Sequence, residues 1–422
     1  MTPPGSSAPI RIDDLAAPRL PLLIRAGSRV AARVAPRRFS LDEESLLAEA
    51  ARETGLRDFG NEKFREPLRI LLRALDEEAA LHDLGRFSVR TSILQLLRTR
   101  LRLVDLLRRH PQILRQEIEQ PIFVVGLPRT GTTLLHNLLS RHPELRYLPY
   151  WESMEPLPRS AAAEPDGDVE ERRATARRGL DFLNKLAPFF PAMHEMECDL
   201  PHEEIQLLAV EFSTMLFETA WQVPAYRRWY MTTDQSSAYA GMKVLLQAMQ
   251  WLRGGDRWLL KSPQHLEQLP VLLRIFPDAR VIQTHRDPWR VLLSMAMMSA
   301  YTARMNSLQI DPRRIGRVWL DRIESMLHTA VRDRAALPAE SFFDVRFGEY
   351  MADNIGMAER VLHFAGEPAS AAGREQMKAF LRDHPRGKYG QVEYDAAQLG
   401  LDRDRVRERL GFYQERFDVP DE

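Results

Sequence analysis

The 422-residue chain contains one cysteine, has no net charge and has no long apolar run. The single cysteine, Cys198, excludes an intramolecular disulfide and fits a reducing compartment. Because 59 acidic residues balance 59 basic ones, nothing indicates a general nucleic-acid or membrane-surface binder. The longest charge-free stretch, residues 291–303, is shorter than the roughly 18 apolar residues of a membrane span. Any anion site must therefore come from local placement of charge.

The N-terminal residues lack the basic and then apolar pattern of a secretory signal, so we expect a cytoplasmic protein. Residues 20–38 are basic and partly apolar, which leaves a membrane-surface arm open. Pro21 and Pro36 favour a plain packing arm instead. A hydrophobic content of 44% is ordinary for a globular protein and allows one large domain or two.

Residues 40–110 show the periodicity of helices. Ser40 and Glu43 have the spacing of a capping box, one apolar pattern ends at Gly55, and a longer one stops at Pro111. We expect residues 1–115 to form a helical portion that supports an α/β domain over residues 116–422.

Four short apolar runs each precede a helical pattern, at residues 121–125, 257–263, 279–288 and 341–350. This alternation predicts an α/β fold with a central parallel sheet and helices on both faces. Ligands of such sheets bind beyond the carboxyl ends of the strands. The polar clusters at residues 129–133, 261–262 and 286–287 are therefore expected to converge.

An insertion of about residues 150–255 separates the first two predicted strands. Residues 159–174 have the composition of a flexible, charged loop, and later parts are helical and rich in aromatics. Because the insertion would cover the ligand edge of the sheet, we assign it to the acceptor side. The aromatic stretch 217–230 is a candidate wall of an apolar pocket, although such stripes are more often core.

The turn after the first strand has the spacing of a nucleotide-binding P-loop, with glycines at Gly126 and Gly131. Backbone N–H groups and the helix N-terminus form an anion site there. The guanidinium of Arg129 can grip an oxyanion. Where a P-loop places the lysine that serves a triphosphate, this chain has Thr132, followed by Thr133. The loop therefore suits an anion of lower charge.

The third cluster offers the second half of a phosphate site. Arg286 ends a strand, Pro288 is a favoured first residue of a helix, and Ser294 follows two turns later. Arg286 and Ser294 can both face one phosphate across the loop. Taken alone, the Arg286–Asp287 pair is as often a helix cap plus a surface charge.

Together these residues resemble the PAPS-dependent sulfotransferases, and the tyrosylprotein and bacterial branch more than the cytosolic small-molecule branch. Their donor is 3′-phosphoadenosine 5′-phosphosulfate (PAPS). In that family a P-[RK]-[ST]-G-T-T loop takes the 5′-phosphosulfate, matched here by residues 128–133, and an arginine and a serine eight residues apart take the 3′-phosphate. Residues 384–395 are similar to the basic segment that closes over the nucleotide, within a closing segment of about 384–400. The resemblance thus implies donor contacts from Arg129, Thr130, Gly131, Thr132, Thr133, Arg286, Ser294 and Lys388, although a charged surface turn fits Lys388 equally well.

The resemblance also implies an in-line sulfuryl transfer to a hydroxyl or amine, without a metal. Glu152 is the expected base, because many relatives have a glutamate at about this distance after the loop. A salt bridge to Arg146 or Arg159 is the alternative. His194 is the rival base, since the cytosolic branch uses a histidine.

Two cations complete the expected catalytic set. Arg129 would hold the sulfuryl oxygens, and Lys261 resembles the lysine that relatives aim at the leaving oxygen. An ion pair of Lys261 with Glu267 or Asp287 is the alternative. His265 follows four residues after Lys261 as a supporting residue.

The sequence His202-Glu203-Glu204 could imitate a metal site, but no matching ligand motif accompanies it. A helix start after Pro201 is the favoured interpretation. We expect no metal.

Two other functions remain open from the sequence: a P-loop kinase-like phosphotransferase, and a non-catalytic nucleotide-binding module. The expected partners are the nucleotide donor and a small-molecule, lipid or glycan acceptor, without nucleic acid. The sequence leaves the oligomeric state open, a homodimer included.

Overall fold

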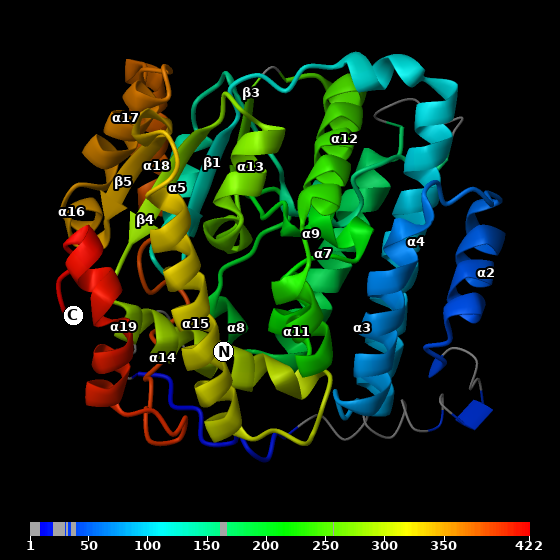
Figure 1. The fold of residues 1–422 in the computed structure, drawn as a ribbon, viewed down its shortest axis with the longest axis horizontal. Helices are drawn as coiled ribbons and strands as arrows, with labels where there is room; N and C mark the ends of the chain where they lie inside the picture. The colour runs from blue at the N-terminus through cyan, green and yellow to red at the C-terminus, as the bar shows by residue number, and fades with distance from the viewer. Residues whose placement is uncertain (1–8, 20–29, 31–32, 35–38, 161–166, 256) are drawn as a thin grey trace.

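A five-stranded parallel sheet lies at the centre of the protein (Figure 1). The computed structural model describes residues 9–19, 30, 33–34, 39–160, 167–255 and 257–422. The membrane-surface arm considered for residues 20–38 therefore lies outside the described residues, apart from residues 30, 33 and 34. The strand order is β2-β3-β1-β4-β5, and every neighbouring pair is parallel. The strands are β1 (Ile122–Gly126), β2 (Leu145–Tyr147), β3 (Arg257–Lys261), β4 (Arg280–His285) and β5 (Phe342–Arg346).

The predicted α/β fold is confirmed. All four predicted strands are present, and β2 is an edge strand of three residues, too short to show a periodic pattern in the sequence. Alternate residues of the strands enter two different clusters. Ile122 and Val124 pack against α5 (Thr132–Leu139) and α17 (Asn354–Phe364), whereas Phe123 and Val125 pack against α12 (Ser236–Arg253) and α13 (Leu269–Ile275). Helices therefore cover both faces.

The N-terminal portion is helical, as predicted. Its helices are α2 (Glu43–Thr54), α3 (Arg65–Glu77) and α4 (Asp83–Arg109). The expected capping box is wrong in one respect: Asp42, not Ser40, caps α2, because its carboxylate accepts a hydrogen bond from the backbone N–H of Ser45 at 2.8 Å. Gly55 ends the helix with a φ of 72°.

The insertion is mostly helical. It contains α6 (Tyr150–Met154), α7 (Val169–Leu186), α8 (Phe190–Met193), α9 (Ile205–Leu208), α10 (Leu216–Ala220), α11 (Pro224–Thr232) and α12. Residues 169–174, expected to be loop, form the first turns of α7; residues 161–166 lie outside the described residues.

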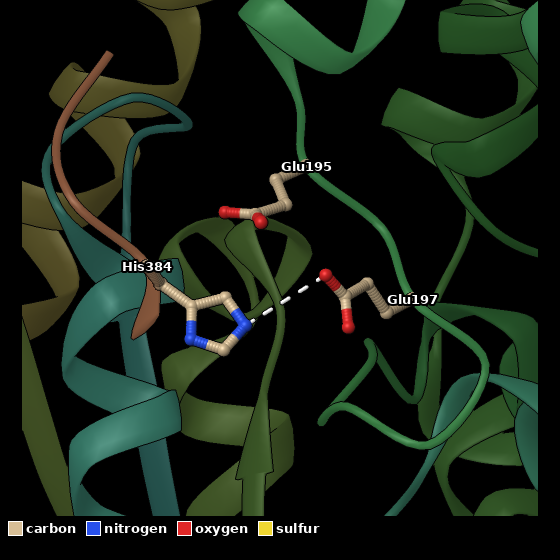
Figure 2. Close-up of side chains that lie close together, drawn as sticks. All are labelled: Glu195, Glu197 and His384. Carbon is tan, nitrogen blue, oxygen red and sulfur yellow. Dashed lines mark ion pairs between the residues drawn. The ribbon is translucent and has the colours of Figure 1, made fainter. Parts of the chain in front are cut away.

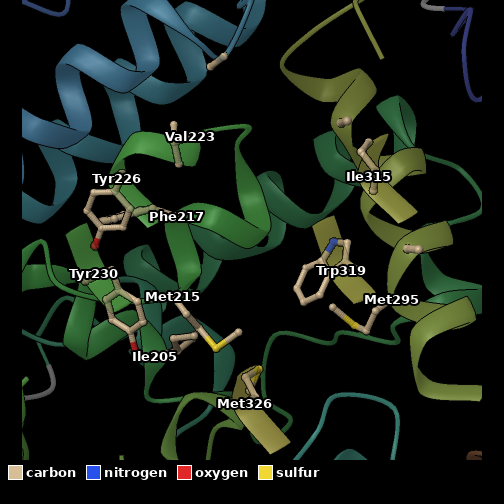
Figure 3. Packing of buried hydrophobic residues seen from close by; sticks show 14 of the residues in the cluster. Ile205, Met215, Phe217, Val223, Tyr226, Tyr230, Met295, Ile315, Trp319 and Met326 are labelled. Atoms are coloured by element: carbon tan, nitrogen blue, oxygen red, sulfur yellow. The ribbon is translucent and has the colours of Figure 1, made fainter. Parts of the chain in front are cut away.

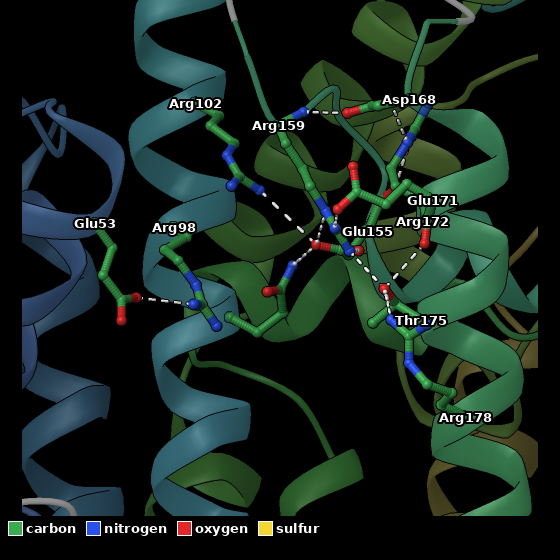
Figure 4. Close-up of polar contacts among 11 residues, drawn as sticks. Glu53, Arg98, Arg102, Glu155, Arg159, Asp168, Glu171, Arg172, Thr175 and Arg178 are labelled. Atoms are coloured by element: carbon green, nitrogen blue, oxygen red, sulfur yellow. Dashed lines mark hydrogen bonds and ion pairs between the residues drawn. The ribbon is translucent and has the colours of Figure 1, made fainter.

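Ion pairs explain why charged residues can begin α7. Figure 4 shows Arg159 between Glu155 and Glu171, and Arg172 beside Asp168. Glu155 also accepts a hydrogen bond from Gln95 of α4 at 3.2 Å. The charges therefore bind the insertion to the N-terminal helices instead of keeping it in solvent.

The remaining helices surround the sheet and the largest core cluster. They include α14 (Pro288–Thr302), α15 (Pro312–Arg334), α16 (Phe347–Ala352), α18 (Ala371–Asp383) and α19 (Arg403–Phe417), and one of several short 3₁₀ helices, η5 (Pro263–Glu267). Figure 3 shows Phe217 and Tyr226 of the insertion in the same cluster as Trp319 and Met326 of α15. Residues of α3 and α4 belong to this cluster too, so one core is shared by the chain on both sides of residue 115. The division into a helical portion and an α/β domain at that residue stays a prediction.

Within the described ranges, no helix is both long and apolar enough to cross a membrane.

Candidate functional site

The loop after β1 is shaped by three residues with positive φ angles. Gly126 has a φ of 144°, and a Cβ atom there would lie 2.3 Å from Oγ1 of Thr284, so only glycine fits. Arg129 has a φ of 71° and Gly131 of 89°. A positive φ is unusual for arginine and is typical of strained functional loops. The loop delivers the chain directly into α5, so backbone N–H groups gather at a helix N-terminus.

Thr130 holds this loop to the sheet. Its Oγ1 donates to the carbonyl oxygen of Leu127 at 2.6 Å and lies 2.6 Å from Oγ1 of Thr284 on β4. The side chain is buried. Thr130 was predicted to contact the nucleotide, but its hydroxyl is hydrogen-bonded within the protein.

The three predicted polar clusters lie at one edge of the sheet. In the parallel register, Val124 of β1 is opposite Lys261 of β3, and Gly126 is opposite Thr284 of β4, so the three strands end side by side. Arg286 donates to the carbonyl oxygen of Arg129 at 2.9 Å. The structure therefore brings the loop, β3 and the start of α14 together.

Arg129, Arg286 and Ser294 form the positive half of the site. Nε of Arg129 donates to Oγ of Ser294 at 3.1 Å, and this hydroxyl donates to the hydroxyl oxygen of Tyr394 at 3.0 Å. Burial lowers the pKa of Arg129; Tyr394 opposes this shift and the charge of Arg286 adds to it. Tyr394 belongs to residues 384–400, so this segment contacts Ser294; its closing over a nucleotide stays a prediction.

The guanidinium of Arg286 is bound by the carboxylate of Glu422. Nε of Arg286 lies 3.0 and 3.1 Å from the two carboxylate oxygens of Glu422, and Nη2 donates to Oε2 at 2.8 Å. The guanidinium also stacks over Phe347, with its central carbon 3.9 Å from the ring centre. Arg286 thus presents a planar fork to an oxyanion, the geometry that also binds phosphate.

Lys261 and Glu203 form the second half of the site. The Lys261 side chain is 3% exposed, and its ammonium makes an ion pair with the Glu203 carboxylate. Burial raises the pKa of Glu203, but the ammonium group of Lys261 acts against it with further contributions from two neighbouring histidines, and the pKa lies below its ordinary value. Glu203 is therefore an ionised acceptor beside the ammonium group.

His194 lies in this half as well. It lines a small cavity together with Lys261, Thr133, Asn137 and His202. Burial lowers the pKa of His194 to about 3, and Lys261 acts in the same direction. His194 is thus a neutral imidazole at neutral pH.

Glu152 lies elsewhere. Its buried carboxylate pairs with Arg146 at 3.2 Å and Arg253 at 3.3 Å. Arg146 stacks over Trp258, three residues before Lys261 on β3, which corresponds to about 10 Å of extended strand. The Glu152 carboxylate is thus paired with two arginines, and its assignment as base stays a prediction.

Lys388, a predicted contact of the nucleotide, forms ion pairs with the insertion. Its ammonium lies 3.2 Å from Glu195 and 3.3 Å from Glu197. Although burial lowers the pKa of Lys388, hydrogen bonds to these carboxylates raise it above its ordinary value. Figure 2 shows both glutamates facing His384, whose Nε2 is 3.7 Å from Glu197. The side chains of Glu195, Glu197 and His384 lie close enough together to ligate one metal ion, but the Lys388 ammonium already pairs with both carboxylates. The group joins the closing segment to the insertion.

Sequence reasoning missed Glu203, Tyr394 and Glu422 as parts of the site. For Glu203 a signal existed, since two adjacent acidic residues directly precede the apolar run 205–210. The favoured helix start is slightly displaced, because α9 begins at Ile205 and the Glu204 side chain does not cap it. The alternative partners of Lys261 are engaged elsewhere: Glu267 binds Arg322, and Asp287 caps α14.

Comparison with known proteins gives consistent matches. A model of the sulfotransferase family matches residues 121–371, more than half of the chain. The omega-hydroxy-beta-dihydromenaquinone-9 sulfotransferase Stf3 of Mycobacterium bovis is 24% identical over 301 residues, which cover 67% of this chain and 72% of that protein.

Two solved structures are similar over most of their length. The sulfotransferase STF9 from Mycobacterium avium has a TM-score of 0.80 and 26% identity, covering 90% of this chain and 98% of that one. STF1 from Mycobacterium tuberculosis H37Rv has a TM-score of 0.75 and 29% identity, covering 88% and 98%. With the family match, the loop and the strand-end cations in agreement, this chain belongs to the sulfotransferase family, and it is an enzyme that transfers sulfuryl groups.

Proposed function

We propose that the protein transfers the sulfuryl group of PAPS to a hydroxyl or amine of an acceptor that has an apolar body. One observation carries the proposal: at a single sheet edge, the Arg129–Ser294–Arg286 group lies beside the Lys261–Glu203 pair, joined by the loop and the ends of β3 and β4. The first group suits a phosphate, and the second suits proton and charge transfer.

Arg286 and Ser294 bind the 3′-phosphate in this proposal, with the Glu422 carboxylate giving way. The loop N–H groups and Arg129 bind the 5′-phosphosulfate. These residues fit such an anion, because the guanidinium groups of Arg129 and Arg286 lie close together in a partly buried space. Arg286 already binds the carboxylate of Glu422. The missing P-loop lysine at Thr132 fits a sulfuryl group, which carries less charge than a terminal phosphate.

In the chemical step, the acceptor oxygen or nitrogen forms a bond to sulfur while the bond from sulfur to the phosphate oxygen breaks. Glu203 takes the acceptor's proton, and the Lys261 ammonium neutralises the charge that develops on the phosphate oxygen. The products are the sulfated acceptor, adenosine 3′,5′-bisphosphate and one proton. No redox partner is needed.

Glu203 is a better base than the other two candidates on the geometry. It is ionised and contacts Lys261, whereas Glu152 is enclosed by Arg146 and Arg253. His194 borders a small cavity together with Lys261 and is neutral, so it can bind the acceptor through a hydrogen bond. We assign it that role.

The apolar body of the acceptor is inferred from the insertion. Trp221, Val223 and Pro224 of the insertion line a cavity together with Ile315 and Trp319 of α15. A relative is named for a hydroxylated dihydromenaquinone, an acceptor of this kind. The cytoplasmic location and the oligomeric state stay predictions.

The test combines binding and transfer. Adenosine 3′,5′-bisphosphate should raise the Tm without Mg²⁺, and ³⁵S-labelled PAPS should label at least one member of a panel of phenols, sterols, lipid alcohols and glycans. Stabilisation by ATP–Mg²⁺ but not by the bisphosphate would favour a kinase instead. Stabilisation by the bisphosphate without label transfer or sulfate release would favour a non-catalytic nucleotide-binding module.

A further inference from the structure

Lys261 is held at two points by consecutive glutamates. Glu203 pairs with its ammonium, and Oε2 of Glu204 accepts a hydrogen bond from its backbone N–H at 2.8 Å. On the β2 side, the registered pairing of β3 ends at Leu259, opposite Tyr147, so Lys261 lies beyond the ladder. The Glu204 carboxylate therefore takes the place of a strand partner at the tip of β3.

The other oxygen of Glu204 begins a buried chain of hydrogen bonds. Oε1 lies 2.5 Å from Nε2 of His265, and Nδ1 of His265 lies 2.7 Å from the hydroxyl of Tyr239. All three side chains have 0% exposure. Burial raises the pKa of Tyr239 well above its ordinary value, so the phenol keeps its proton and donates to Nδ1, and Nε2–H then donates to Glu204.

The chain connects three separate elements. Tyr239 lies on α12, His265 on η5, and Glu204 just before α9. A buried carboxylate is costly unless its oxygens are hydrogen-bonded, and here both oxygens have partners. Because residues 203 and 204 share one peptide bond, fixing the side chain of Glu204 also fixes the backbone that carries Glu203.

We propose that Glu204, His265 and Tyr239 are positioning residues that align Lys261 with Glu203 for the transfer step, an inference that rests on the proposed function. They touch neither donor nor acceptor. Their loss should lower kcat and leave donor binding nearly unchanged.

The test uses Glu204→Gln, with Glu267→Gln as the matched control. Glu267 lies on the same 3₁₀ helix as His265, is nearly buried, and binds Arg322 at 2.6 and 2.5 Å, away from Lys261. Glu204→Gln should lower kcat about 10-fold to 100-fold while the donor KM stays within about twofold. Glu267→Gln should lower the Tm without lowering kcat.

Two further measurements separate positioning from general destabilisation. The double variant Glu203→Gln/Glu204→Gln should have the kcat of Glu203→Gln alone, because both changes act through one pair. Tyr239→Phe removes only the last hydroxyl and should lower kcat severalfold with little change in Tm; an unchanged kcat would contradict its role.

One readout does not depend on turnover. Lys261 should be acetylated by an N-hydroxysuccinimide ester several times faster in Glu204→Gln than in the wild type or in Glu267→Gln, as measured by peptide mass spectrometry. Equal rates in all three proteins, or a kcat of Glu204→Gln equal to that of Glu267→Gln, would overturn the inference. An inactive wild type with the expected acetylation pattern would instead count against the proposed function alone.

Discussion

The two halves of the site are built in different ways. The proposed donor half, around Arg129, Arg286 and Ser294, lies on a loop and a helix start that directly follow β1 and β4. The proposed catalytic half joins Lys261 to Glu203, 58 residues earlier, and depends on how the insertion packs on the sheet.

Their electrostatics differ as well. In the donor half, two arginines lie close together and the Glu422 carboxylate is bound to one of them. In the catalytic half, Lys261 is nearly buried and pairs with Glu203, while Glu204 is bound through both its oxygens. The comparison teaches that one half is suited to bind an anion and the other to hold a fixed geometry, so substitutions should separate binding from turnover.

Replacing Lys261 should have the largest effect on turnover. In Lys261→Met the leaving oxygen loses its cation, and we expect kcat to fall about 10²-fold to 10³-fold. Calorimetry should find the Kd for adenosine 3′,5′-bisphosphate within a few-fold of the wild type. A large loss of bisphosphate affinity with normal kcat would place Lys261 in the donor half.

Replacing Arg286 should give the opposite pattern. Arg286→Ala removes a charged hydrogen-bond donor and should raise the Kd for the bisphosphate about 10-fold to 100-fold, with kcat at saturating donor nearly unchanged. Arg290→Ala, at an exposed position of α14, the helix that follows Arg286, is the control for general charge. Unfolding of Arg286→Ala would show that the residue is structural.

Replacing Glu422 should have a smaller effect, of opposite sign. Glu422→Gln weakens the contact that competes for Arg286 and should lower the Kd for the bisphosphate about twofold to fivefold. Asp421→Asn removes the same charge from a neighbour that pairs with Arg407, and should leave this Kd unchanged. Identical effects of both variants would mean that only net charge matters.

A separate prediction concerns acid stability, measured apart from binding and turnover. Burial lowers the pKa of His136 to about 3 from an ordinary value of 6.5. Between these values the unfolded chain binds a proton that the folded chain does not, so the free energy of unfolding falls as the pH falls. His136→Gln should reduce this slope by about 1.4 kcal/mol per pH unit in urea titrations. An unchanged slope would mean that His136 takes up its proton in the folded state.

The sequence predicted that the segments carrying Arg129 and Arg286 would converge, because each lies in a short strand-to-helix connection. The positions of Gly126, Gly131, Arg286 and Ser294 are set by strand-to-helix turns, whose geometry depends on local backbone requirements. The same reasoning predicted four strands and missed β2, whose three residues are stabilised by pairing with β3.

The catalytic half was only partly predictable. The place of Lys261 at a strand end could be read from an apolar run, but its partner could not, because contacts between distant segments leave no local pattern. Lys388 and Glu203 illustrate this: each is a charged residue whose partner is decided by tertiary packing.

Single-turnover transfer from ³⁵S-labelled PAPS, compared between Glu203→Gln and Glu152→Gln at saturating donor, tests the central claim most directly. The account predicts a loss of about 10²-fold or more for Glu203→Gln and less than about threefold for Glu152→Gln, with both proteins folded. A large loss in Glu152→Gln together with normal transfer by Glu203→Gln would contradict it.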